Sequence, residues 1–179
     1  MLWTILLVPA FLAIAFLVVA ALQPADFRYE RHLAIATPAS VPFGWVNDLH
    51  RFQKWSPWAR IDPAVKNTFT GPAAGVGAAL AWDGNSKVGA GSMTITESRP
   101  SDLVRLRLDF LRPFRATHTA EFTFRAEGTQ TLVSWSMTGR NNIPAKAFGL
   151  FVNLDRMVGR DFEKGLASLK ALAESRPDN

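Results

Sequence analysis

The sequence contains no cysteine, which excludes disulfide bonds, thiolate catalysis and cysteine-ligated zinc. Its three histidines, His32, His50 and His118, lack the spacing of a metal site, and no oxygen-rich calcium loop is present. The glycine-rich stretches 71–77 and 89–91 lack the lysine or the following helix of a phosphate-binding loop. We therefore expect no metal and no cofactor.

Charge is absent from the amino-terminal run Leu2–Leu22, which is apolar apart from a threonine and a proline. At 1.5 Å per residue, a helix of about 20 residues crosses a hydrocarbon core of about 30 Å. The run therefore predicts a transmembrane anchor over residues 1–23, followed by a linker over residues 24–26.

A cleaved signal peptide is the alternative for this run, because residues 18–20 end in the small side chains that a peptidase accepts. The length of the run, and the lack of a basic residue before it, favour the anchor. Arg28 and Arg31 follow the run and place the rest of the chain in the cytoplasm. We therefore expect a single-pass membrane protein with a cytoplasmic domain.

The remaining residues, 27–179, are enough for one domain, since 48% of the chain is hydrophobic and the net charge is only +5. Residues 27–35 alternate between apolar and polar side chains, which predicts a strand. A short helix is expected over residues 39–52. The Trp-Ser-Pro-Trp sequence at 55–58 must end it, because the residue before a proline avoids helical backbone angles.

Strand-like runs separated by turn signals fill residues 65–140, which predicts an antiparallel meander. Alternation places apolar side chains on an inner face and polar ones, such as Arg105 and Glu121, on the outer face. An apolar stripe over residues 144–174 predicts a long terminal helix that covers the inner face. The expected fold class is therefore α+β.

Several motifs resemble those of the START-like, polyketide cyclase and lipid-transport superfamily, also called SRPBCC, over residues 27–175. They are VNDLHRFQKWSPW, GAGSMTITE followed by FLRPF, WSMTG and GRDFEKGLASLK. The resemblance implies a helix-grip fold, in which a curved antiparallel sheet of about seven strands wraps around a long C-terminal helix. Two short helices, split at WSPW, follow the first strand, and the transmembrane helix precedes the domain.

The resemblance also implies a largely apolar cavity between the sheet and the terminal helix. The inward pattern alone fits a filled core equally well, and only the resemblance favours a pocket. The bulky inward side chains are the candidates for its lining, with the two WSPW tryptophans near one end. The candidate ligand-binding residues are Trp55, Trp58, Trp82, Met93, Phe110, His118, Phe122, Trp135 and Phe151.

His118 is the one ionisable side chain that the strand pattern places inside. Imidazole titrates near neutral pH, so His118 could act as a general acid or base. A lone inward histidine is more often a hydrogen-bonded core residue or a polar contact for a ligand. Ser134 and Ser136 have no histidine near them in the sequence. We therefore assign no catalytic residue.

Basic residues gather at one hairpin over residues 99–115. This cluster fits a solvent-exposed outer face of the sheet, and it also fits a surface that contacts anionic lipid headgroups. Nucleic acid is not expected, because the aromatic side chains alternate inward, away from this charge. We expect membrane-anchored binding or transport of a hydrophobic, lipid-like small molecule. The alternatives are an enzyme of the polyketide cyclase or dehydratase type and a ligand-free protein-interaction module.

Overall fold

The computed structural model describes residues 2–175, with side chains from residue 8 onward. The helices are α1 (Leu2–Leu22), α2 (Ser40–Asn47), α3 (Leu49–Trp55), α4 (Ile143–Gly149) and α5 (Leu154–Glu174). The strands are β1 (Asp26–Ile35), β2 (Lys66–Thr70), β3 (Ala79–Asp83), β4 (Ala90–Arg99), β5 (Leu103–Arg112), β6 (Ala116–Glu127) and β7 (Gln130–Arg140). The predicted α+β class is confirmed.

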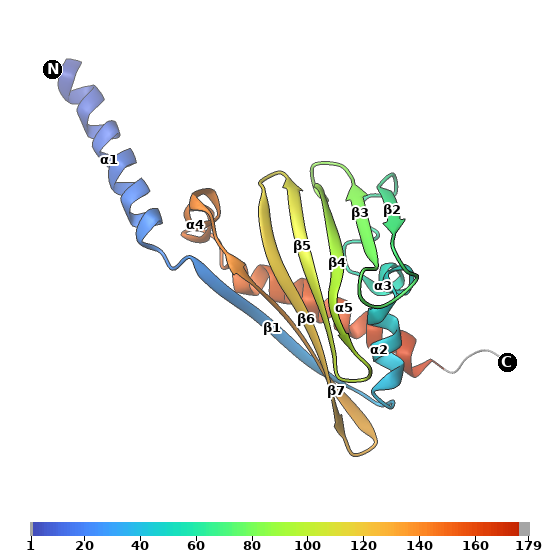
Figure 1. Cartoon of the computed structure of the whole chain (residues 1–179). Coiled ribbons are helices and arrows are strands. Elements are labelled where there is room, and N and C mark those ends of the chain that lie inside the picture. Colours follow the sequence, from blue (N-terminus) through green and yellow to red (C-terminus); the bar gives the residue numbers. More distant parts are fainter. Residues whose placement is uncertain (1, 176–179) are drawn as a thin grey trace.

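The strands form one seven-stranded antiparallel sheet in the order β1-β7-β6-β5-β4-β3-β2 (Figure 1). β2 to β7 follow one another as a meander, as the turn signals predict. β1 joins the far edge of the meander by pairing with β7 from Asp26–Arg140 to Ile35–Thr131. The expected seven-stranded antiparallel sheet is therefore confirmed.

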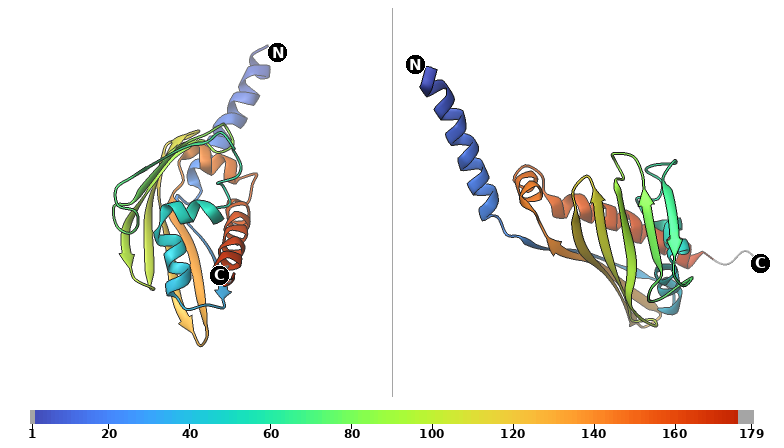
Figure 2. Two further views of the ribbon diagram at one scale, coloured as in Figure 1. Left: turned by 90° about the vertical axis from the view of Figure 1, so that its right-hand side faces the viewer. Right: turned by 45° about the horizontal axis from the view of Figure 1, so that its top comes forward.

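The sheet curves around α2, α3 and α5, which lie on its inner face (Figure 2). α5 follows the β1 edge, where the Arg31 guanidinium forms ion pairs of 3.0 Å with both Asp155 and Glu163. Gly159 makes room for this guanidinium, since a Cβ there would lie 2.0 Å from Arg31 Nη2. The long C-terminal helix is thus held against one edge of the sheet.

The two short helices are divided at Asp48, not at WSPW as predicted. Asp48 has extended backbone angles, and its carboxylate accepts hydrogen bonds from the N–H groups of His50 (2.8 Å) and Arg51 (3.3 Å). This arrangement caps α3 and starts a new helix. α3 ends at Trp55, and Ser56 before the proline has an extended ψ of 129°, as predicted.

The single helix predicted over residues 144–174 is instead two helices, α4 and α5. Asn142 caps α4 by accepting a hydrogen bond of 3.0 Å from the Ala145 N–H. Asn153 caps α5 in the same way, since its side chain accepts a hydrogen bond of 2.8 Å from the Arg156 backbone N–H. The prediction missed this second cap because the apolar stripe continues through the turn between the two helices.

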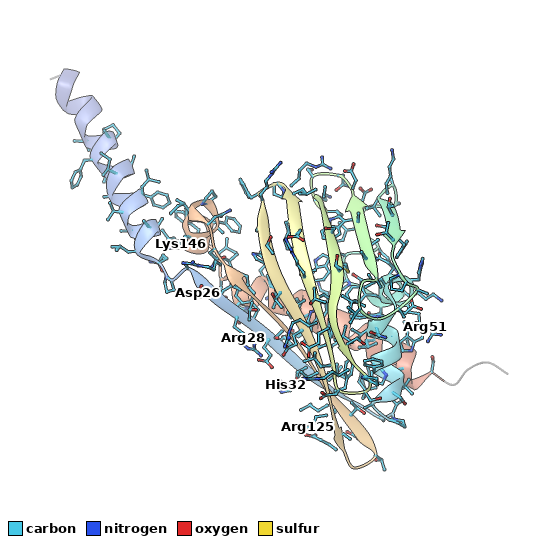
Figure 3. The ribbon with its side chains drawn as sticks, in the orientation of Figure 1. Asp26, Arg28, His32, Arg51, Arg125 and Lys146 are labelled. Carbon is cyan, nitrogen blue, oxygen red and sulfur yellow. The ribbon has the colours of Figure 1, made fainter. Side chains whose placement is uncertain are left out.

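α1 extends away from the domain and contacts α4 (Figures 1 and 2). Phe16 stacks on Phe151 at 5.8 Å, and Lys146 Nζ of α4 donates a hydrogen bond of 3.0 Å to the Ala21 carbonyl. Figure 3 shows Lys146 beside the start of β1. Across the described part of the chain, no helix has the length and apolar character needed to cross a membrane. The predicted anchor is therefore unsupported, and the predicted single-pass membrane localisation is wrong.

Candidate ligand-binding face

The candidate residues fall into three places rather than one cavity. Trp55, Phe122 and Trp135 lie in the core, and the half-buried Trp58 packs against it. Trp82, Phe110 and His118 lie at the open end of the inner face, together with Met93, which also borders the core. Phe151 lies apart, against α1. The difference arises because α2, α3 and the buried part of α5 cover only one end of the inner face.

Trp135 is at the centre of the packed group. Its side chain is 2% exposed and stacks between Phe122 at 4.8 Å and Phe162 at 4.1 Å. Trp55 and Trp58 meet this indole edge-on, each with its ring centroid 5.6 Å away. Four aromatic rings therefore contact Trp135, two of them stacked and two T-shaped, and the WSPW corner supplies core packing.

The open end begins on β3, β4 and β5, where Gly91 pairs with Trp82 on one side and with Phe110 on the other. The two aromatic rings meet edge-on, with their centroids 5.9 Å apart. A Cβ at Gly91 would lie 2.6 Å from the Trp82 ring. The glycine therefore allows the indole to lie across β4, and both rings remain only half-buried.

The open end continues on β6 and β7. His118 pairs with Leu108 of β5 and with Gly139 of β7, and a Cβ at Gly139 would lie 2.5 Å from His118 Cδ2. We call the inner-face residues at this end the His118 face. They are Phe27, Trp82, Gly91, Met93, Leu108, Phe110, Ala116, His118, Met137 and Gly139.

His118 carries the one ionisable side chain of this face. Phe27 meets its ring edge-on at 4.9 Å, and the Phe110 ring lies 5.4 Å away. Its Nδ1 atom is buried and has no hydrogen-bond partner among the described residues. Burial lowers the pKa of His118 below its usual value of 6.5, because an apolar environment disfavours the charged imidazolium.

The charged side chains in the middle of β5 and β6 lie on the opposite side of the sheet. Arg105 forms ion pairs with Glu97 and, at 2.8 Å, with Glu121, and Arg107 pairs with Asp109 at 2.9 Å. These outward positions agree with the predicted alternation. The His118 face carries no formal charge when His118 is neutral, so it favours an apolar ligand over a charged one.

A pocket of about 420 Å³ lies elsewhere, between the linker before β1, α4 and the turn that leads into α5. Phe151 lines this pocket and is 79% exposed, because the break between α4 and α5 moves it off the apolar stripe where it was predicted. Lys146 and Asn153 also line the pocket, but they bond to Ala21 and to the Arg156 N–H. None of the residues that line this pocket belongs to the His118 face, so the two sites are separate.

Sequence reasoning did not select Tyr29, Gly91 or Gly139. Tyr29 is 8% exposed and stacks on Phe27 at 4.6 Å. Its burial raises the pKa of the phenol, and a hydrogen bond with the Asn141 side chain acts in the opposite direction. The available signal was a glycine inside a strand, which often marks a place where another group approaches the backbone closely.

The His118 face has few side chains that could support acid–base or metal chemistry. Within the described residues, no three metal-ligating side chains lie together, and no hydrogen bond links His118 to a carboxylate. The arrangement therefore offers an apolar surface with a single imidazole, which is typical of a binding site with one orienting polar group.

A curved antiparallel sheet that holds a long C-terminal helix defines a helix-grip protein. The family model for "Polyketide cyclase / dehydrase and lipid transport" matches residues 24–174, from the linker through α5. The chain therefore belongs to this family, which confirms the resemblance seen in the motifs. No curated protein matches the chain significantly.

Solved structures with the same fold have low sequence identity to the chain. A protein from Chromobacterium violaceum has a TM-score of 0.61 and 14% identity, covering 86% of this chain and 100% of its own. The Aha1 dimer from Colwellia psychrerythraea has a TM-score of 0.59 and 15% identity, covering 83% and 96%. The di-domain ARO/CYC protein StfQ of the steffimycin biosynthetic pathway has a TM-score of 0.63 and 14% identity, covering 84% and 51%. At sequence identities this low, the similarity to these structures shows a shared fold alone.

Proposed function

We propose that this protein binds a hydrophobic small molecule on the His118 face, between the sheet and α5. The observation that carries the proposal is the contrast between the two ends of the inner face. One end is filled by aromatic rings around Trp135, whereas the other leaves Trp82, Met93 and Phe110 half-buried. Apolar side chains around a small number of polar groups are the usual lining of a small-molecule site.

Leaving these apolar side chains exposed to water costs free energy. Full burial of a large apolar side chain contributes about 1.5–3 kcal/mol, so several half-buried ones keep a substantial part of this free energy for a ligand. Gly91 and Gly139 let the Trp82 and His118 rings lie close over the strands, so these two rings form part of the surface that a ligand would contact. Membership of a family described by polyketide cyclases, dehydrases and lipid transport supports an apolar ligand.

Saturable binding of a neutral apolar dye, N-phenyl-1-naphthylamine, tests this proposal. Ala116 lies on the His118 face and the next residue, Thr117, is exposed on the outer face. We expect Ala116→Trp to abolish saturable dye binding by filling the open end. Thr117→Trp is the matched control and should bind as the unmodified protein does. Equal binding by both variants would place the dye elsewhere.

An enzyme of the cyclase type is the second candidate. Two observations favour it: the ARO/CYC protein StfQ shares the fold, and the imidazole of His118 lies on the proposed binding face. Turnover of a polyketide-like substrate that disappears in His118→Phe, while substrate binding persists, would rank the enzyme first. A protein-interaction module would instead show no saturable binding of apolar dyes.

A further inference from the structure

The orientation of His118 indicates which apolar molecules the face would select, an inference that rests on the proposed function. Ten residues define the His118 face, and nine of them have hydrocarbon, aromatic, indole or thioether side chains or none. Besides the indole N–H of Trp82, the imidazole of His118 is therefore the one strong polar group that a ligand on this face would contact. What this group can donate or accept decides which polar atom the ligand must carry.

The imidazole ring is held in place by apolar contacts. Phe27 lies edge-on to it at 4.9 Å, and Phe110 lies 5.4 Å away. Gly139 lies beneath the other edge, because a Cβ there would be 2.5 Å from His118 Cδ2 and 3.0 Å from Cγ. These contacts hold the ring over Gly139, and Nε2, unlike Nδ1, is not among the buried atoms without a hydrogen-bond partner. The Cε1–Nε2 end is the part that reaches furthest from the strand.

The buried Nδ1 atom decides the tautomer. It has no hydrogen-bond partner among the described residues, so a proton on Nδ1 would be a buried donor without an acceptor. Buried unpaired N–H groups are rarer in proteins than under-used acceptors. A neutral imidazole in this position therefore keeps its proton on Nε2 and leaves only a lone pair on Nδ1.

We propose that the Nε2–H group of His118 donates a hydrogen bond to an oxygen acceptor, such as a ketone carbonyl, on the otherwise apolar ligand of this face. The ligand class is then an apolar ring or chain compound with one acceptor oxygen. A pure hydrocarbon of the same shape binds through the apolar walls alone. Loss of one hydrogen bond between neutral groups corresponds to about a three- to tenfold weaker affinity.

A matched pair of probes tests this inference with the full-length protein. In 2-acetylnaphthalene and 2-isopropenylnaphthalene, a carbonyl oxygen in one replaces a methylene group in the other, and their shapes are closely similar. We expect the ketone to bind about three- to tenfold more tightly than the hydrocarbon, measured by quenching of tryptophan fluorescence. His118→Phe should remove this preference, whereas Thr119→Val, on the outer face of the same strand, should keep both the preference and the affinities.

The outcomes separate the two claims. Equal affinity of the two probes for the unmodified protein would overturn the His118 inference and leave the proposed function standing. A preference that survives in His118→Phe would also overturn it. If neither probe binds saturably, the proposed function fails and the inference fails with it. Nitrogen-15 NMR of the unmodified protein gives an independent check, and a proton found on Nδ1 would contradict the inference even if the variants do not fold.

Discussion

Replacing Trp135 by alanine should be among the most destabilising changes in this domain. The indole is 2% exposed, and the substitution removes ring contacts of 4.1 Å with Phe162 and 4.8 Å with Phe122. Truncating a fully packed aromatic residue costs about 3–5 kcal/mol, because the lost burial and the residual cavity add together. The free energy of unfolding should fall by this amount.

Trp82→Ala is the matched control, since it removes the same side chain from the same face of the sheet. Trp82 is only half-buried, and its described ring contact is with Phe110 at 5.9 Å. Partial burial predicts a loss of about 1–2 kcal/mol. Urea denaturation followed by circular dichroism measures both losses, provided that the m-value is unchanged. A Trp135→Ala variant that loses no more than Trp82→Ala would refute the division of the inner face into a packed end and an open end.

Three further predictions concern α5 and the pH dependence. Gly165→Ala places a methyl group 2.7 Å from the Trp135 ring. The overpacking costs about 1–3 kcal/mol, which should exceed the roughly 1 kcal/mol that alanine gains in helix propensity. Thermal unfolding measures the net loss of stability. Gly159→Ala displaces only the flexible end of Arg31, so its melting temperature should change less than that of Gly165→Ala. Burial lowers the pKa of His118, so as the pH falls below 6.5 the unfolded chain binds this proton before the folded protein does, and stability falls. The urea midpoint should therefore drop more between pH 7.5 and pH 5 in the unmodified protein than in His118→Phe.

The sheet could be predicted because its information is local in the sequence. Strict alternation in β5 places Leu106 inward and Arg107 outward, and the structure shows Leu106 at 1% exposure and Arg107 exposed. Turn signals between the strands then fix the antiparallel order. β1 also pairs with β7 at a long distance along the chain, a pairing that the family resemblance implies and that local alternation does not contain.

The helix boundaries were harder to predict, because caps compete with apolar periodicity. Asp48 and Asn153 each accept backbone hydrogen bonds that start a new helix within an apolar pattern that continues past them. The periodic signal gives one long helix, whereas a single capping side chain, which contributes about 1 kcal/mol, marks a break. The division at Asn153 is what moved Phe151 out of the predicted lining.

The site residues could be assigned to a face of the sheet but not to a position along it. Phe110 and Phe122 have the same inward phase, yet Phe122 is fully buried and Phe110 half-buried. The reason is the placement of α5, which packs Phe162, Leu166 and Leu169 into the core and also contacts β1 through Arg31. Such a contact between β1 and the end of the chain leaves no mark in the local pattern of β5 or β6.

Methionine methyl NMR tests the central claim most directly, because the chain has only four methionines. Met93 and Met137 lie on the His118 face, whereas Met157 of α5 is 44% exposed and lies outside it. Titration of protein labelled at the methionine methyl groups with 2-acetylnaphthalene should shift the Met93 and Met137 signals saturably and leave Met157 unchanged. Unchanged Met93 and Met137 signals at saturating probe, or a shift confined to Met157, would contradict binding at the His118 face.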